Sequence, residues 1–133
     1  MSVAQRIDEY LKQTGIFFLS TEDGAQPKCR PLGFYIVLHD KVYFGVGTFK
    51  DVYKQMQENP NVEICASKPD GFLRIYGKAV FEKDYEIATA ALEKAPFLKN
   101  IYNDETGYKL GIFHIEGTAE FRSMMKVEES FEI

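Results

Sequence analysis

The residues best suited to chemistry in this sequence lie in one glycine-rich stretch from Gly45 to Lys50, which reads GVGTFK. Apolar residues recur at helical spacing after it, so its backbone N–H groups would lie at a helix N-terminus. A lysine is unfavourable in that position, because the helix macrodipole favours negative groups. A bound anion would remove the conflict, and the Thr48 hydroxyl and Lys50 ammonium would both contact it. The stretch therefore indicates a candidate phosphate site.

Two established nucleotide-binding patterns match this stretch only in part. A strand, Gly45-x-Gly47, a helix and an acidic residue about twenty positions later imitate the dinucleotide fingerprint. Its third glycine position is Lys50, however, and the flanking strands are expected in hairpins instead of a parallel sheet. A triphosphate-binding loop is disfavoured further, because Lys50 does not follow a glycine and is followed by Asp51.

Folding alone offers a competing explanation for most of the same stretch. Thr48 and Asp51 have the spacing of a capping box, and an apolar stripe at helical spacing would pack on the core. That stripe consists of Phe49, Val52, Tyr53 and Met56. Folding leaves Lys50 unexplained, so from the residues alone both interpretations stay open.

Arg30 and Pro31 form a second candidate site for an anion. Proline lacks the N–H that a central strand requires, so this strand must lie at an edge, be bulged or be irregular. The neighbouring arginine is a good partner for an anion or for the polar edge of a ring. His39 and His114 have no nearby nucleophile or carboxylate pattern, and we interpret them as surface or interface residues.

Hydrophobic periodicity predicts a mainly antiparallel α+β domain. A Ser2–Gln5 capping box starts a helix that ends at Gly15, and a second helix follows the glycine-rich stretch. A third helix is expected from Asp84 to about Ala95, before a short helical turn at 96–102. Strands are expected at 16–21, 28–38, 41–46, 61–67, 72–82 and 110–122, whereas 124–133 has no assignment. Six hairpin-ordered strands favour a barrel with helices outside.

Length and composition restrict the class of protein. The 133 residues fit one domain, 1–133, and no apolar run approaches the roughly 20 residues of a membrane span. A net charge of -4 argues against a general nucleic-acid surface. Cys29 and Cys65 lack metal-ligand spacing, so no metal site is predicted. The polar N-terminus lacks the pattern of a secretory signal, and a cytoplasmic location is expected.

Three segments together resemble the small FMN-binding split-barrel proteins of the pyridoxamine 5'-phosphate oxidase-like superfamily. They are FFLSTEDGAQPKCRPLGF, KVYFGVGTFKDVYKQMQENPNVEICAS and FLRIYGKAVF, in this order and spacing. The best markers are the Arg30-Pro31 step, the T-x-K before a helix that ends in Asn59-Pro60, and the R-I-x-G-K-A strand. The resemblance runs from about Ile7 to Phe121.

The resemblance implies a six-stranded split barrel that forms a homodimer, with two FMN sites at the subunit interface. Arg30 and Lys50 would hold the FMN phosphate, and Thr48 would add a hydroxyl. Main chain at Pro31, Leu32, Gly33, Gly45 and Val46 would run beside the flavin and its ribityl chain. The partner subunit would close each site with its own copy of strand 72–76, which carries Phe72 and Arg74.

The activity expected from this resemblance is electron transfer between a reduced nicotinamide and a small acceptor. Vitamin B6 oxidation itself is poorly supported, because the chain lacks the basic, histidine-containing C-terminal motif of the true oxidases. Tyr35 also stands where those enzymes place a lysine near the flavin. Two alternatives stay open: a non-catalytic module that binds flavin or haem on the same dimeric barrel, and a dimeric scaffold with an empty groove.

Overall fold

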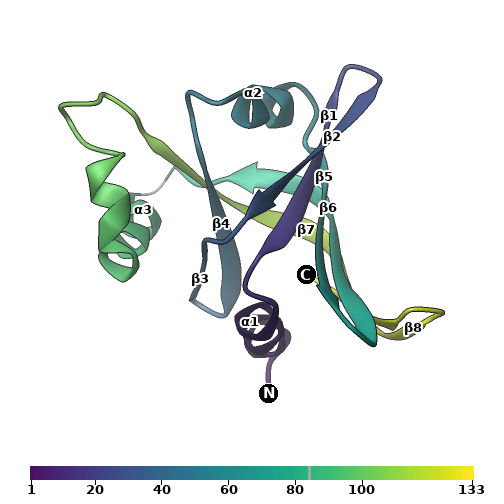
Figure 1. The fold of residues 1–133 in the computed structure, drawn as a ribbon. Coiled ribbons are helices and arrows are strands. Elements are labelled where there is room, and N and C mark those ends of the chain that lie inside the picture. Colours follow the sequence, from purple (N-terminus) through teal and green to yellow (C-terminus); the bar gives the residue numbers. More distant parts are fainter. Residues whose placement is uncertain (84) are drawn as a thin grey trace.

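The computed structural model describes residues 1–83 and 85–133, and it shows one strongly curved antiparallel sheet with helices around it (Figure 1). The strands follow the order β2-β1-β5-β6-β7-β4-β3, and β8 pairs with β7. Their bounds are β1 Phe17–Asp23, β2 Gln26–Leu32, β3 Tyr35–Leu38, β4 Lys41–Gly47, β5 Asn61–Lys68, β6 Gly71–Phe81, β7 Leu110–Ser123 and β8 Val127–Glu132. The helices are α1 Val3–Thr14, α2 Asp51–Glu58, α3 Tyr85–Lys94 and the 3-10 helix η1 Pro96–Asn100.

The described residues form eight strands where the sequence predicted six. The predicted strand 28–38 is two strands, because the chain leaves β1 after Leu32 and pairs again with β4 from Tyr35 onward. β2 and β3 lie at opposite ends of the strand order, yet only residues 33 and 34 separate them. Such a link spans at most about 11 Å, so the sheet must curl until its two edges meet. This curl produces the predicted split barrel.

The eighth strand, β8, lies in the tail that the sequence analysis left unassigned. Its side chains are exposed apart from the half-buried Phe131, so it has no alternating apolar pattern to detect. Backbone pairing with β7 holds it instead, and Phe131 adds an edge-on contact to Phe121 with ring centroids 6.1 Å apart. Arg6 of α1 secures β8 further through two contacts to the Glu129 carboxylate, at 2.8 and 2.6 Å.

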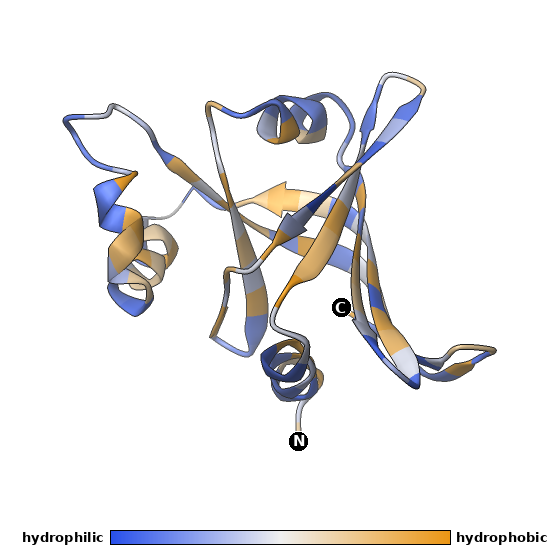
Figure 2. Ribbon diagram, viewed as in Figure 1, coloured by the Kyte–Doolittle hydropathy of each residue, from blue (hydrophilic) through white to orange (hydrophobic). Residues whose placement is uncertain are grey.

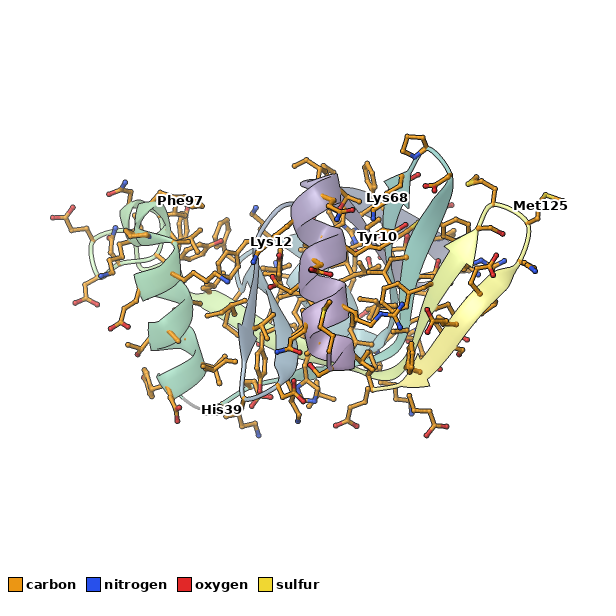
Figure 3. The ribbon with its side chains drawn as sticks, turned by 90° about the horizontal axis from the view of Figure 1, so that it is seen from below. Tyr10, Lys12, His39, Lys68, Phe97 and Met125 are labelled. Atoms are coloured by element: carbon orange, nitrogen blue, oxygen red, sulfur yellow. The ribbon has the colours of Figure 1, made fainter. Side chains whose placement is uncertain are left out.

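Helix α1 forms as predicted and covers one opening of the barrel. Ser2 Oγ accepts a hydrogen bond from Gln5 N at 3.2 Å, and Gln5 Oε1 accepts one from Ser2 N at 2.8 Å. Its apolar side buries Ile7 and Leu11 in the main core, and hydrophilic residues occupy its other side (Figure 2). At the end of β5, the Lys68 ammonium lies 3.9 Å from the Tyr10 ring centroid (Figure 3).

Helices α3 and η1 form an extension at one side of the barrel, opposite the β7–β8 hairpin (Figure 1; Figure 3). A second apolar cluster attaches it, in which Ile87 and Ala91 pack with Ile36, Tyr43 and Ile112. Both helices confirm the sequence prediction, although the predicted cap at Asp84 lies outside the described residues. Among the residues described, no helix is both long and apolar enough to cross a bilayer.

Candidate functional site

Arg30 of β2 and Lys50 at the start of α2 lie in the wall of one cavity of about 550 Å³. The wall combines the edge strand β2, the ends of β1 and β4, the first half of α2 and the loop after η1. It is formed by Asp23, Lys28, Arg30, Pro31, Leu32, Gly45, Val46, Gly47, Lys50, Asp51, Val52, Gln55 and Tyr102. The two predicted cations therefore line the same cavity as four of the predicted main-chain positions, which are Pro31, Leu32, Gly45 and Val46. We call this space the basic pocket.

Among the residues described, the hydrogen-bond partners of the Arg30 guanidinium are all neutral oxygen atoms. Its Nη1 donates to Thr21 Oγ1 at 2.7 Å and to the Leu19 carbonyl at 3.2 Å, and its Nη2 donates to Gln55 Oε1 at 3.0 Å. In the described part of the chain, no carboxylate lies within ion-pair distance of Arg30. Burial lowers the pKa of this guanidinium below its ordinary value, because a less hydrated site disfavours the charged form.

Thr21 and Gln55 complete a closed network behind Arg30. Thr21 is only 2% exposed, and its hydroxyl donates to Gln55 Oε1 at 2.6 Å while accepting from Arg30. Strand β1 supplies Thr21, strand β2 supplies Arg30 and helix α2 supplies Gln55. Three separate elements therefore fix the arginine, so its orientation is set before any ligand arrives.

Lys50, and not Thr48, is the N-cap of α2, so the predicted Thr48–Asp51 capping box is wrong. The Thr48 N–H donates to the Lys109 carbonyl at 2.9 Å, which holds Thr48 beside the start of β7 and two residues before the N-cap. Lys50 has extended backbone angles, and its side chain makes no capping hydrogen bond. The first-turn N–H groups of α2 thus lack a side-chain acceptor in the described residues, while the Lys50 ammonium lines the same pocket.

Three predicted binding positions besides Thr48 also lie outside the basic pocket of this chain: Gly33, Phe72 and Arg74. Gly33 is exposed in the link between β2 and β3. Phe72 and Arg74 stand on the outer face of β6, opposite the core residues Leu73 and Ile75. The sequence analysis assigned this strand to the partner's site, and that assignment stays a prediction.

Arg74 belongs to a charged network on that outer face, which we call the outer-face cluster and define as Glu63, Arg74, Glu120 and Arg122. Arg74 Nε lies 3.3 Å from Glu63 Oε2, and Glu120 Oε1 lies 3.8 Å from Arg74 Nη1 and 3.1 Å from Arg122 Nη1. The distance from Arg74 Nε to Glu63 is that of an ion pair, but its geometry gives no hydrogen bond. Each arginine here nevertheless has a carboxylate.

Lys28, Gln55 and Tyr102 line the basic pocket and were missed as site residues. Lys28 had a usable signal, because it lies two positions before Arg30 and alternate strand residues share a face. Gln55 and Tyr102 had none, since a glutamine in an amphipathic helix and a tyrosine in a loop are ordinary. The loop after η1 reaches the pocket because Thr48 pairs with Lys109 and because the rings of Phe49 and Tyr108 stack 4.0 Å apart.

Gly47 leaves the space that this loop occupies. A side-chain Cβ at Gly47 would lie 2.7 Å from the Phe49 ring and 3.1 Å from the Tyr102 hydroxyl. Burial raises the pKa of Tyr102 above 10.0, so the phenol stays protonated and can donate a hydrogen bond. Gly47 therefore belongs to the architecture of the pocket, and Tyr102 supplies a donor near Lys50.

The two histidines lie away from the basic pocket. His39 is exposed in the tight turn between β3 and β4, as predicted, with positive φ at both His39 and Asp40. His114 is buried in the chain, whereas the sequence predicted a surface or interface residue without a carboxylate nearby. Two carboxylates in fact contact it, since Glu82 Oε1 lies 2.8 Å from Nδ1 and Glu116 Oε1 lies 3.3 Å from Nε2. It borders a second, largely apolar cavity of about 510 Å³ beneath α1.

Solved structures of other proteins share the fold of this chain. The chain is 32% identical to a NimC/NimA family protein from Clostridium acetobutylicum, with a TM-score of 0.84 over 98% of this chain and 93% of that one. A putative pyridoxamine 5'-phosphate oxidase from Listeria innocua has 20% identity and a TM-score of 0.67, over 94% of this chain and 100% of that one.

A more distant structure shares the fold alone. It is a FAD-binding protein from Mesorhizobium loti, with 14% identity and a TM-score of 0.62 over 90% of this chain and 93% of that one. A haem-binding protein from Mycobacterium smegmatis is equally distant, at 15% identity and a TM-score of 0.70 over 99% of this chain and 58% of that one. No curated protein matches. The model of the pyridoxamine 5'-phosphate oxidase family matches residues 3–105, and the chain belongs to that family.

Proposed function

We propose that this protein binds FMN and acts as a flavin-dependent oxidoreductase on a small molecule. The observation that carries the proposal is the state of Arg30, a half-buried cation that donates to neutral oxygens and lines the pocket with the further cations Lys28 and Lys50. Such an arrangement is stable only if its cost is offset elsewhere, and a bound dianion offsets it directly. Asp23 and Asp51 also line the pocket, so the excess positive charge is local and small.

The pocket residues fit the phosphate end of FMN. Arg30, Lys28 and Lys50 would contact the phosphate, and the uncapped first turn of α2 would add backbone N–H groups. Main chain at Pro31, Leu32, Gly45 and Val46 would run along the ring and ribityl chain, where strands permit a flat group to approach. When bound, FMN supplies hydride and electron transfer between a reduced nicotinamide and an acceptor. The residues themselves bind and orient the cofactor.

A homodimer is part of the proposal, because the predicted Phe72 and Arg74 contributions must come from a second chain. Exposed apolar side chains on the outer sheet face support such an interface, since Phe18 is 45% exposed and Tyr76 is 36% exposed. A chain carrying Arg30→Ala and Lys50→Ala, mixed with a chain carrying Phe72→Ala and Arg74→Ala, should regain about one FMN per dimer. Recovery of no site would contradict the shared arrangement.

Tyr35 does not replace the lysine that the true oxidases carry near the flavin. Its hydroxyl donates to Asp8 Oδ1 at 2.7 Å and to the Asp8 carbonyl at 3.0 Å, which directs it toward α1. Tyr35 is therefore committed to the fold. The missing positive charge supports a different substrate from pyridoxine phosphate. A cytoplasmic location, with access to reduced nicotinamides, fits this activity.

Haem or another flavin is the competing ligand, in keeping with the names of the two distant relatives. Among the described residues that line the basic pocket, Tyr102 is the one side chain of a type that commonly ligates haem iron. The visible spectrum of the purified protein distinguishes these ligands. We expect flavin absorbance with about one FMN per chain and bleaching by a reduced nicotinamide without oxygen. A Soret band, or no uptake of FMN, would contradict the proposal.

A further inference from the structure

The hydrogen bonds around Arg30 determine which way the Gln55 amide faces. The oxygen and nitrogen of a glutamine amide are assigned from their partners. Arginine has donors only, so the Gln55 atom 3.0 Å from Arg30 Nη2 must be the oxygen. Thr21 accepts from Arg30 and so keeps its own hydrogen for the same Gln55 oxygen, 2.6 Å away. The Gln55 oxygen therefore accepts two hydrogen bonds, and an amide with its oxygen and nitrogen interchanged could not make both contacts.

The Gln55 amide nitrogen is the part of this network that keeps unused hydrogens. It makes no hydrogen bond to any residue in the described ranges, and Gln55 lines the basic pocket beside Arg30. An NH₂ group carries two donors, and leaving them unsatisfied costs stability wherever water is displaced. The group that fills the pocket next to Gln55 must therefore offer acceptors.

We propose that Gln55 is a direct ligand of the phosphate, which it contacts through its side-chain NH₂ group while its oxygen holds Arg30. This inference rests on the proposed FMN function and adds a residue that the sequence analysis did not assign to the site. Gln55 and Arg30 then present donors side by side to a group that only accepts. A dianionic phosphate monoester matches that surface, and a neutral hydroxyl end such as that of riboflavin does not.

Gln55→Glu tests the donor role of Gln55, and Gln55→Met tests the same role without a new charge beside Arg30. In Gln55→Glu the carboxylate still accepts from both Thr21 and Arg30, so the network and the fold are retained. The variant loses the two donors and places a negative charge against the phosphate. We expect FMN affinity to fall about a hundredfold or more, because a hydrogen bond to a charged group contributes roughly ten- to hundredfold and repulsion adds to the loss.

Gln57→Glu is the matched control, because Gln57 lies on the same helix, is exposed and takes no part in the pocket. It makes the same change in net charge and should leave FMN affinity within about twofold. Gln55→Met removes the donors without adding charge, and we expect a smaller loss of about tenfold. It also provides the test if Gln55→Glu does not fold.

The experiment measures dissociation constants for FMN and riboflavin by flavin fluorescence, with melting temperatures to verify folding. The inference predicts that Gln55→Glu weakens FMN binding and leaves riboflavin binding within about threefold, so phosphate selectivity disappears. Equal loss for both ligands, or no loss for FMN, would overturn the assignment of Gln55 while leaving the proposed function intact. If the unaltered protein itself does not bind FMN, the proposed function fails and this inference fails with it.

Discussion

Two groups of arginines in this barrel differ in how their charges are compensated. In the outer-face cluster, Arg74 and Arg122 share the Glu120 carboxylate, so the charges cancel within the chain. In the basic pocket, the partners of Arg30 in the described part of the chain are Thr21, Gln55 and a carbonyl. The first arrangement is complete without a ligand, whereas the second gains stability from an external anion. Compensation by the chain itself thus distinguishes Arg74 and Arg122, whose charges already face carboxylates, from Arg30, whose charge does not.

The largest expected effect comes from removing the pocket cations. Arg30→Ala combined with Lys50→Ala removes two charge-assisted contacts, which should weaken FMN binding about 10²- to 10⁴-fold. Equilibrium titration measures the loss, and riboflavin serves as the ligand without phosphate. If the double variant kept the FMN affinity of the unaltered protein, Arg30 and Lys50 would not bind the phosphate.

Arg122→Gln tests the other side of the comparison. Arg122 and Glu120 are 18% and 13% exposed in their side chains, so the change leaves a partly buried carboxylate with one cation fewer. We expect the free energy of unfolding to fall by about 1–3 kcal/mol, with a far smaller loss of FMN affinity than the double pocket variant shows. Denaturant unfolding and flavin titration on one preparation measure both. A large loss of FMN affinity without loss of stability would reverse the roles assigned to the two groups.

Asp8 is a negative group whose charge is stabilised within the chain, as the charges of the outer-face cluster are. The Tyr35 hydroxyl, and then Lys12, lower the pKa of Asp8 below 3.8 against the opposing effect of burial. The ionised form therefore stabilises the fold above the ordinary pKa, and this stabilisation is lost as pH falls through the lowered value. Tyr35→Phe should cost about 1.5–3 kcal/mol at neutral pH, and the cost should shrink in acid.

The matched control for that variant is Tyr53→Phe, whose lost hydroxyl makes no hydrogen bond to the residues described. The free energy of unfolding of each variant is measured by denaturant titration at several acidic pH values. A Tyr35→Phe deficit that stays constant down to the lowest pH would show that Asp8 ionisation is not the source.

The smallest expected effect concerns Tyr102, a neutral donor in the basic pocket. Tyr102→Phe should weaken FMN binding about two- to tenfold, the range of a neutral hydrogen bond. The same change at the exposed Tyr108, which stacks on Phe49 outside the pocket, should have no such effect. Equal affinities for the Tyr102 variant and the unaltered protein would limit the pocket's donors to the cations, Gln55 and the helix.

Most strands, both long helices and the Arg30–Lys50 pair were predictable, because periodicity and turn residues report local preferences. The break after Leu32 could not be predicted. The chain passes from one edge of the sheet to the other at Gly33 because the barrel closes there, and the local sequence carries no signal of that closure. β8 escaped because its exposed residues carry no alternation. The cap of α2 was misplaced because Thr48 pairs with Lys109, a contact far away in sequence. The sequence also provided no signal for Gln55 of α2, since its proposed role depends on contacts to Thr21 of β1 and Arg30 of β2.

The most direct test of the central claim is a comparison of FMN and riboflavin binding to the unaltered protein. The two ligands share the flavin ring and ribityl chain and differ only in the phosphate. If Arg30, Lys28 and Lys50 form a phosphate site, FMN should bind at least about a hundredfold more tightly, from two or more charge-assisted contacts, and the preference should shrink as salt rises. Equal affinity for both ligands would contradict the account.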